Sequence, residues 1–291
     1  MDFGTAQSVV LSGIVLGSLY AMMATGLSLV WTTLGIFNFA HGVFMTIGAF
    51  IAWQVGTDLG WGWGPAAGVA IGIAGMIGLG CASEFLLVRP FLSRQGIVLV
   101  AVITTLSAAI FLENGALLLW GARYKQMPPL IDGKVELFST AISAHEVLII
   151  GIAPLSLLLL WAYLKFTRFG SAIRAVSQNR ESALLMGMSV PTLYSMAFGL
   201  SAGLAGLAGI LLGSIRFITP GLGNEPLVKA LVVSIFGGLG SIGGTIGAAY
   251  VIGLLEAVST FFIGLYWTPA VLFSVMIGVL MVRPTGLFGR R

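Results

Sequence analysis

The feature that most constrains this chain is the recurrence of apolar segments about as long as a bilayer is thick. A hydrocarbon core about 30 Å across needs about 20 apolar residues in helical form. Inside lipid every backbone N–H and C=O must find a partner within the protein, which a helix provides. The apolar segments cover residues 9–32, 39–55, 63–87, 97–120, 147–164, 193–214, 226–237, 245–263 and 269–282.

Composition supports the same interpretation. Charged residues make up 8% of the chain and the mean hydropathy is +1.04, whereas a soluble domain has roughly 25% charged residues. We therefore predict an all-α polytopic membrane protein with a single transmembrane domain over residues 1–291. The second, seventh and ninth segments are short, and glycine-rich or polar breaks border two of them. Broken or re-entrant helices are an alternative to full crossings, so the expected number of transmembrane helices is about eight to ten.

Lysine and arginine gather in three places between or after the apolar segments, and cytoplasmic loops are the ones enriched in these residues. The first cluster lies in the link after residue 87, the second in residues 165–190 and the third in the tail after residue 282. With the N-terminus outside and nine crossings, all three fall on the cytoplasmic side and the mixed-charge loop 121–146 falls outside. The residues concerned are Arg89 and Arg94; Lys165, Arg168, Arg174 and Arg180; and Arg283, Arg290 and Arg291.

The stretch IFNFAHGVFMTIGAF, residues 36–50, puts two polar side chains into an apolar, glycine-punctuated run. Two interpretations remain open for Asn38 and His41. In the first, Asn38 caps the second helix and His41 bonds a neighbouring carbonyl. In the second, both residues and Gly42 line a translocation pathway. A metal site is not indicated, because His41 has no Cys, Asp or Glu nearby.

Four further polar residues fall within the predicted spans, where a charge is costly and has to face protein or water. Glu113 and Asn114 lie toward the outer end of the fourth span, Lys229 near the start of the seventh and Glu256 well inside the eighth. These four are candidates for the translocation pathway. Alternatively, Lys229 and Glu256 pair across adjacent helices and serve only the structure.

The eighth span also carries small residues that allow close helix packing. Gly243 lies just before this span, and Gly247 and Gly253 lie within it. We expect all three to be suited to close contact with another helix.

The segment TRFGSAIRAVSQNRESALLMGMSVP, residues 167–191, is the most distinctive piece outside the membrane. We expect Ser171 to cap a short helix that runs to Met186, and Gly187 to end it in the left-handed conformation. Pro191 prevents simple continuation. Arg174, Gln178 and Glu181 fall on its polar face.

Three blocks in this order carry a family resemblance. They are GIFNFAHGVFMTIGAF, TRFGSAIRAVSQNRESALLMGM and KALVVSIFGGLGSIGGTIGA. Together they closely resemble permease subunits of bacterial branched-chain amino-acid ABC importers, and the resemblance extends over nearly the whole chain. It implies that residues 167–190 form the cytoplasmic coupling helix that docks on the ATPase. Glu181, Ser182, Ala183 and Gly187 then take the places of the E-A-A and glycine elements, with Ser182 where an alanine is expected.

The resemblance also implies the partners and the location. These are a second permease subunit, identical or homologous, two ABC ATPase subunits, and a periplasmic binding protein that delivers leucine, isoleucine, valine or a related amino acid, all at the bacterial inner membrane among its lipids. No nucleic-acid partner is indicated. The chain contains no GxxxxGK[ST] motif, so we expect it to be no enzyme by itself and to bind no cofactor. ATP and Mg would be used by the partner ATPases.

Other functions stay open. A urea or short-chain amide ABC permease has a similar sequence pattern. A secondary transporter or channel would need Glu113 or Glu256 as its ion-coupling carboxylate. A membrane-embedded enzyme is the remotest alternative, because no constellation of His, Asp, Cys or Ser is clustered in the sequence.

Overall fold

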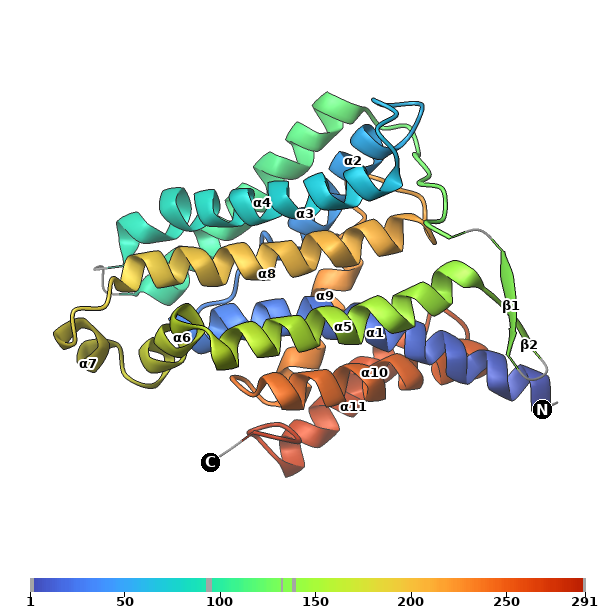
Figure 1. The fold of residues 1–291 in the computed structure, drawn as a ribbon. Coiled ribbons are helices and arrows are strands. Elements are labelled where there is room, and N and C mark those ends of the chain that lie inside the picture. Colours follow the sequence, from blue (N-terminus) through green and yellow to red (C-terminus); the bar gives the residue numbers. More distant parts are fainter. Residues whose placement is uncertain (1–2, 93–95, 132, 138–139, 290–291) are drawn as a thin grey trace.

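The computed structural model describes residues 3–92, 96–131, 133–137 and 140–289 as an almost entirely helical bundle (Figure 1). The α-helices are α1 (Phe3–Leu34), α2 (His41–Gly56), α3 (Pro65–Ser83), α4 (Ile97–Trp120), α5 (Ala144–Phe166), α6 (Arg168–Gln178), α7 (Arg180–Leu185), α8 (Val190–Gly213), α9 (Asn224–Gly237), α10 (Ile242–Ile263) and α11 (Thr268–Val282). A π-helical turn, Glu84–Val88, and a 3₁₀ turn, Arg89–Phe91, follow α3. The antiparallel strands β1 (Lys134–Leu137) and β2 (Thr140–Ser143) form a small hairpin before α5.

Each of the nine predicted apolar segments forms a helix, which confirms the all-α polytopic prediction. In the described part of the chain, six helices have the length and hydropathy of a membrane crossing, namely α1, α3 with its following turns, α4, α5, α8 and α10. The three segments expected to be short are short: α2 has 16 residues, α9 has 14 and α11 has 15.

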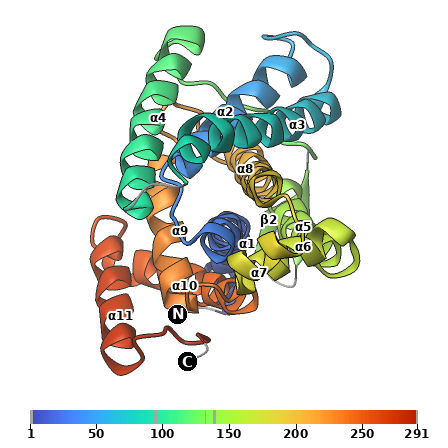
Figure 2. The same cartoon turned by 90° about the vertical axis from the view of Figure 1, so that its left-hand side faces the viewer.

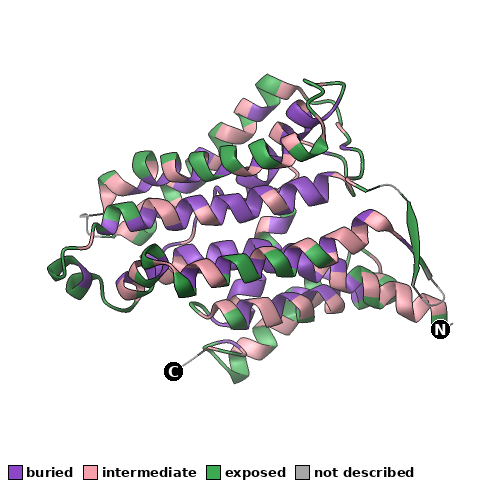
Figure 3. Cartoon of the chain, in the orientation of Figure 1, coloured by how far each residue is buried: buried purple, intermediate pink, exposed green. Residues whose placement is uncertain are grey.

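The core lies around α1 and α8, the most deeply buried of the long helices (Figure 3). Helix α1 packs against α10, α8, α9 and α5, while α8 also packs against α2 and α3. Helix α4 stands at the periphery, and most of its large apolar side chains are exposed. Apolar exposure of this kind is expected of a helix that faces lipid or another membrane subunit.

Glycines allow the closest helix contacts. A Cβ atom on Gly17 would lie 2.9 Å from Tyr250 Cα, so α1 and α10 can approach this closely only because no side chain intervenes. Gly253 meets the same region of α1, as predicted. The prediction for Gly243 and Gly247 is wrong: a Cβ atom on Gly243 would meet open space, and one on Gly247 would make only ordinary contacts with Phe288.

The two ends of the bundle carry different elements. Helices α6 and α7 lie at one end, and the N-terminal end of α1 lies with the β1–β2 hairpin at the other (Figure 1). This separation agrees with the predicted placement of residues 165–190 and of loop 121–146 on opposite sides of a membrane. Of the basic residues that predicted the orientation, Arg94, Arg290 and Arg291 lie outside the described residues.

Helix α9 runs at a steep angle to the long helices. In Figure 2, which looks at the α6–α7 end, α1 is seen nearly along its axis and α9 is seen side-on. Its N-terminal end meets the N-terminal end of α2, where a Cβ atom on Gly42 would lie 2.6 Å from the carbonyl oxygen of Gly223. Both short helices therefore begin at one close contact inside the molecule.

Candidate functional site

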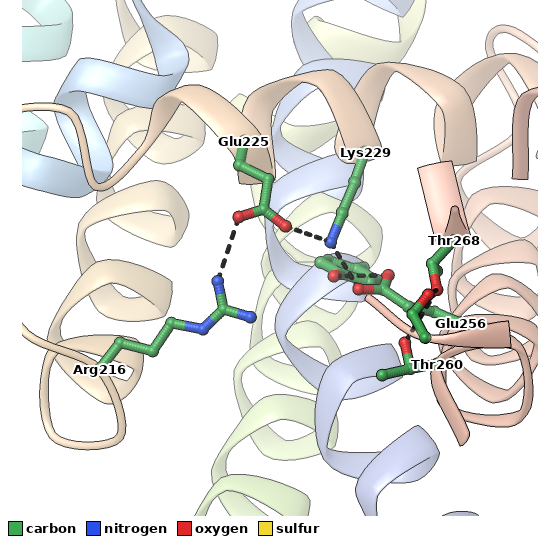
Figure 4. Close-up of polar contacts among 8 residues, drawn as sticks. Arg216, Glu225, Lys229, Glu256, Thr260 and Thr268 are labelled. Carbon is green, nitrogen blue, oxygen red and sulfur yellow. Dashed lines mark hydrogen bonds and ion pairs between the residues drawn. The ribbon is translucent and has the colours of Figure 1, made fainter. Parts of the chain in front are cut away.

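Charged side chains from α9 and α10 meet inside the bundle (Figure 4). Lys229 Nζ lies 2.5 Å from Glu256 Oε1 and 2.5 Å from Glu225 Oε1, one turn earlier on α9. The second carboxylate oxygen of Glu256 accepts a hydrogen bond of 2.8 Å from the Tyr20 hydroxyl of α1. The structure therefore confirms that Lys229 and Glu256 pair across adjacent helices, and it adds two partners.

The row of charged side chains that starts at Glu256 and Lys229 continues through Glu225 to the surface. Glu225 Oε2 lies 3.2 Å from Arg216 Nη1, which belongs to the loop between α8 and α9. The side chains of Arg216 and Glu225 are 42% and 53% exposed, whereas those of Lys229 and Glu256 are 10% and 2% exposed. The two cations and two carboxylates alternate along this row of four side chains, so their charges sum to zero. Neutrality and mutual hydrogen bonds offset much of the cost of placing charge in the bundle.

An open cavity of about 400 Å³ borders this row of charged side chains, at the end of the molecule opposite α6 and α7. Arg216, Glu256 and Thr260 contribute to its wall. The hydroxyl-bearing residues Thr5, Ser8 and Ser12 of α1 line the facing side. The rest of the wall is apolar, from Val9, Leu16, Ala257, Phe261 and Leu265, so the cavity joins the buried charges to the outer end of the bundle along a wall of mixed character.

Sequence reasoning missed Tyr20, Arg216 and Glu225. Two signals were available. Glu225 precedes Lys229 by four residues, the spacing at which charges on a helix pair, and Arg216 is a basic residue in a loop predicted to lie outside, against the usual bias. Tyr20 sits in an apolar run, where its hydroxyl shows no distinctive pattern.

The start of α9 connects several of the predicted residues. We use "α9 hub" for Gly223, Asn224, Glu225 and Lys229. Besides the charge pairs, Gly223 N donates a 2.9 Å hydrogen bond to Thr46 Oγ1 of α2, and Asn224 Nδ2 donates one of 3.2 Å to Glu113 Oε1 of α4. Two turns of α9 are thereby tied to α2, α4, α10 and α1.

Asn114, the neighbour of Glu113, does not join this network. Its Nδ2 donates a 2.8 Å hydrogen bond to the carbonyl oxygen of Ile110, one turn earlier in α4. The residue is exposed on the outer face of that helix.

His41 is completely buried between α1, α2 and α8. Its Nε2 lies 3.1 Å from the carbonyl oxygen of Met23, and its Nδ1 lies 3.3 Å from Ser201 Oγ. Ser201 in turn donates a 2.8 Å hydrogen bond to the carbonyl oxygen of Gly26. The carbonyl contact is the one that the first interpretation of His41 predicts.

Asn38 lies in the turn that leads into α2 and is 1% exposed. Its Oδ1 accepts a 3.0 Å hydrogen bond from the backbone N–H of Ala40. The side chain therefore stabilises the turn before α2, although the residue directly preceding the helix is Ala40. Asn38 Nδ2 is buried without a hydrogen-bond partner among the described residues. A place for Asn38, His41 and Gly42 on the translocation pathway stays a prediction.

The segment between α5 and α8 forms two helices, so the prediction of one helix capped by Ser171 is wrong. Thr167 caps α6 by accepting a hydrogen bond from Gly170 N, and Asn179 caps α7 by accepting one from Ser182 N, at 3.0 Å and 2.9 Å. The backbone of Asn179 is extended, with φ of −154°. Its side chain accepts a hydrogen bond from the backbone N–H of Ser182, and this bond takes the place of one that a continuous helix would make.

The end of α7 agrees with the prediction. Gly187 has φ of +76°, in the left-handed region. Its N–H bonds the carbonyl of Leu184, and the N–H of Met188 bonds that of Ala183, the paired pattern that often terminates a helix at glycine. Ala183 is buried, while Leu185 and Met186 are 89% and 78% exposed. The tip of this segment thus presents apolar side chains outward.

The α6–α7 segment is anchored to three long helices. Ile173 and Val176 of α6 and Ala183 of α7 belong to one apolar cluster with side chains of α1, α5 and α8. The remaining residues predicted to face an ATPase are exposed on the segment, namely Arg174, Gln178, Glu181, Ser182 and Gly187.

Comparison with known proteins identifies relatives over nearly the full length of the chain. The family described as "Branched-chain amino acid transport system / permease component" matches residues 9–283. The chain is 32% identical to the high-affinity branched-chain amino acid transport system permease protein LivH of Escherichia coli (strain K12), over 96% of this chain and 94% of LivH. It is 31% identical to the corresponding permease protein BraD of Pseudomonas aeruginosa, with the same coverage. A probable branched-chain amino acid transport permease protein of Methanocaldococcus jannaschii is 27% identical over 97% of this chain and 93% of its own length. No solved structure matches the chain.

Proposed function

This chain belongs to the family of branched-chain amino acid transport permeases, and we propose that it forms half of the translocation pathway of an ABC importer for leucine, isoleucine, valine or a related amino acid. The other half would be a second permease subunit, identical or homologous. Two ABC ATPase subunits would bind at the cytoplasmic side of the bacterial inner membrane. A periplasmic binding protein would deliver the substrate at the opposite end.

The observation that carries this proposal is the α6–α7 segment. It lies at one end of the bundle, projects exposed apolar residues at its tip, and is anchored by buried residues to α1, α5 and α8. An ATPase that moves this segment would displace three long helices, because the contacts behind it are close-packed. The chain itself needs no nucleotide site in this mechanism, and ATP and Mg would be bound by the partners.

The α9 hub lies toward the outer end of the bundle, where it would respond to movement of the α6–α7 segment. Its contacts hold α9 to α2, α4, α10 and α1 next to the cavity at the outer end. Movement of α1 and α8 would alter these contacts and open or close the space between the helices. Alternating access then needs two arrangements of the same packed helices.

Reconstitution in vesicles tests the function. The permease is purified with its native ATPase subunits and reconstituted, and uptake of radiolabelled leucine is measured with ATP inside and the binding protein outside. We expect uptake only when all components and ATP are present. Leucine uptake without the ATPase would instead indicate a secondary transporter or channel, and uptake of urea in place of amino acids would reassign the substrate.

A matched assay addresses the enzyme question. The isolated permease should release no phosphate from ATP. Hydrolysis should appear with the ATPase subunits and rise when the loaded binding protein is added. Turnover by the permease alone would contradict the proposed division of labour.

A further inference from the structure

An apolar groove with a basic mouth lies on the side of the bundle, apart from the α9 hub. It is lined by α5 from Pro154 to Lys165, by Arg174 of α6 and by α10 from Ile242 to Tyr250, and it holds a volume of about 620 Å³. Helices α5 and α10 both pack on α1, which separates the groove from the interior (Figure 2). We call this feature the basic groove.

The depth of the basic groove corresponds to one leaflet of a bilayer. Pro154 and Lys165 are separated by 11 residues of α5, which is about 16 Å of helix. The hydrocarbon core is about 30 Å thick, so one leaflet contributes about 15 Å. With residues 165–190 on the cytoplasmic side, as the sequence predicts, the groove would extend from the cytoplasmic headgroup level to about the middle of the membrane.

The wall of the basic groove is almost entirely aliphatic and aromatic. Its inner part contains Leu157, Leu160 and Ile246. The one hydroxyl of the lining, that of Tyr250, is engaged with Ser18 of α1 at 3.3 Å. A ligand in the inner part of the basic groove therefore has to be apolar, since the hydrogen-bonding groups of a polar ligand would stay unpaired there.

The mouth has the opposite character. Lys165 and Arg174 both line it and both are exposed. Lys165 Nζ lies 4.5 Å from the ring centroid of Trp161, at the border between apolar wall and charge. Neither cation forms an ion pair with a described residue, and no acidic residue lines the groove. Two cations at the cytoplasmic headgroup level attract anionic lipid.

We propose that the basic groove binds one anionic phospholipid of the cytoplasmic leaflet, with an acyl chain along α5 and α10 and the phosphate between Lys165 and Arg174. Such a lipid would contact both α6, through Arg174, and α10, through Ile242 and Ile246. It therefore supports the α6–α7 segment from the lipid side.

Two other occupants fit less well. A second copy of this chain, related by a twofold axis along the membrane normal, would place Lys165 and Arg174 of both copies at the same depth, so an interface across this groove would gather four cations at one level without an acidic lining residue to balance them. An amino-acid substrate would carry its ammonium and carboxylate into the inner part, where the wall offers no partner for either.

Native mass spectrometry of the purified full chain tests the proposal. Phosphatidylglycerol and phosphatidylcholine with identical acyl chains are titrated separately. We expect phosphatidylglycerol to bind more tightly. Replacing Lys165→Gln and Arg174→Gln should weaken its binding about fivefold per cation removed and leave phosphatidylcholine unchanged. Arg168→Gln is the matched control, because Arg168 is exposed at the start of α6 but does not line the groove.

A second pair of variants tests the apolar part. Gly243→Phe places a ring in the groove, where a side chain meets open space, and should reduce binding of both lipids at this site. Gly278→Phe in α11 is its control, because a Cβ atom there also meets open space, away from the groove. Unchanged phosphatidylglycerol binding in the groove variants, or an equal loss with Arg168→Gln, would overturn the proposal.

Disulfide cross-linking tests whether a second copy of this chain occupies the groove instead. Leu158→Cys is placed on the groove wall in a Cys81→Ser background, and the membranes are oxidised. We expect no disulfide-linked permease dimer, because lipid covers this face. Efficient dimer formation would show that a second copy covers the groove and would overturn the lipid assignment.

Discussion

Lys229 of α9 and Glu256 of α10 form an ion pair of 2.5 Å in the bundle, although 27 residues separate them in the chain. Tyr20 and Glu225 complete the surroundings of the pair. The pair therefore connects the inclined helix α9 to the tightly packed α1–α10 unit. Its energetic role and its role in transport can be separated by substitution.

Lys229→Met should destabilise the protein by about 3 kcal/mol, because it leaves the buried carboxylate of Glu256 without its cation. Adding Glu256→Gln removes the second charge and retains an acceptor for Tyr20, so the double variant should return to within about 1 kcal/mol of wild type. Unfolding of the purified proteins measures both values. We expect uptake by the double variant to stay about fivefold or more below wild type, the scale of an allosteric coupling. Full recovery of uptake together with stability would make the pair purely structural.

Coupling to the ATPase should depend on the conformation of Gly187. Gly187→Val forces a β-branched residue into φ of +76°, a strain of about 1–2 kcal/mol that displaces the tip of α7. We expect normal insertion but uptake and binding-protein-stimulated ATP hydrolysis reduced about fivefold or more. Gly278→Val, in an exposed part of α11 with ordinary backbone geometry, is the matched control. Glu181→Lys tests the exposed face of α7 independently. Wild-type uptake in both Gly187→Val and Glu181→Lys would remove the coupling assignment.

Accessibility at Asn38 should depend on the state of the transporter. In a Cys81→Ser background, Asn38→Cys should resist a small polar thiol reagent in the nucleotide-free complex, because the position is 1% exposed. Ser12→Cys, in the open outer cavity, should react and serves as the control. Trapping the complex with ATP should expose position 38 if the pathway opens beside α2. A functional variant that stays unreactive in every state would leave Asn38 only its part in the turn before α2.

His41→Gln should preserve uptake over the range of about pH 5.5 to 8. Glutamine can donate to the Met23 carbonyl as the ring does, but it cannot titrate. His41→Ala is the contrast, because it leaves that buried carbonyl unpaired at a cost of about 1–3 kcal/mol. Uptake measured against pH separates the two roles. Loss of uptake by His41→Gln on one side of this range, where the wild type is active, would indicate an essential proton transfer.

Much of the fold was predictable because the bilayer acts on local sequence. Apolar length decides which segments become helices, and the clustering of lysine and arginine decides which loops stay in the cytoplasm. Even the three short helices followed from segment length alone. Gly187 was predictable for a similar reason, since the left-handed end of a helix depends on the residue that occupies it and on its nearest neighbours.

The division of residues 167–190 into α6 and α7 was not predictable in the same way. Arg, Ala, Ser and Glu around Asn179 all permit a helix, and the break depends on whether the Asn179 side chain bonds the backbone ahead of it. In the folded protein, Ile173, Val176 and Ala183 all reach one apolar cluster on α1, α5 and α8. The break allows both short helices to contact it.

What the sequence by itself determined was therefore which apolar segments become helices, which connecting segments carry the basic residues, and the family to which the chain belongs. Only the tertiary structure decided which residues meet: Lys229 with Glu256, the α9 hub with α2 and α4, and Gly253 rather than Gly243 with α1. The physical reason is that a bilayer sorts residues by polarity and length but exerts no preference for the rotation of one helix against another. That rotation is set by close packing of small residues and by the pairing of buried polar groups, which depend on side chains far apart in the chain.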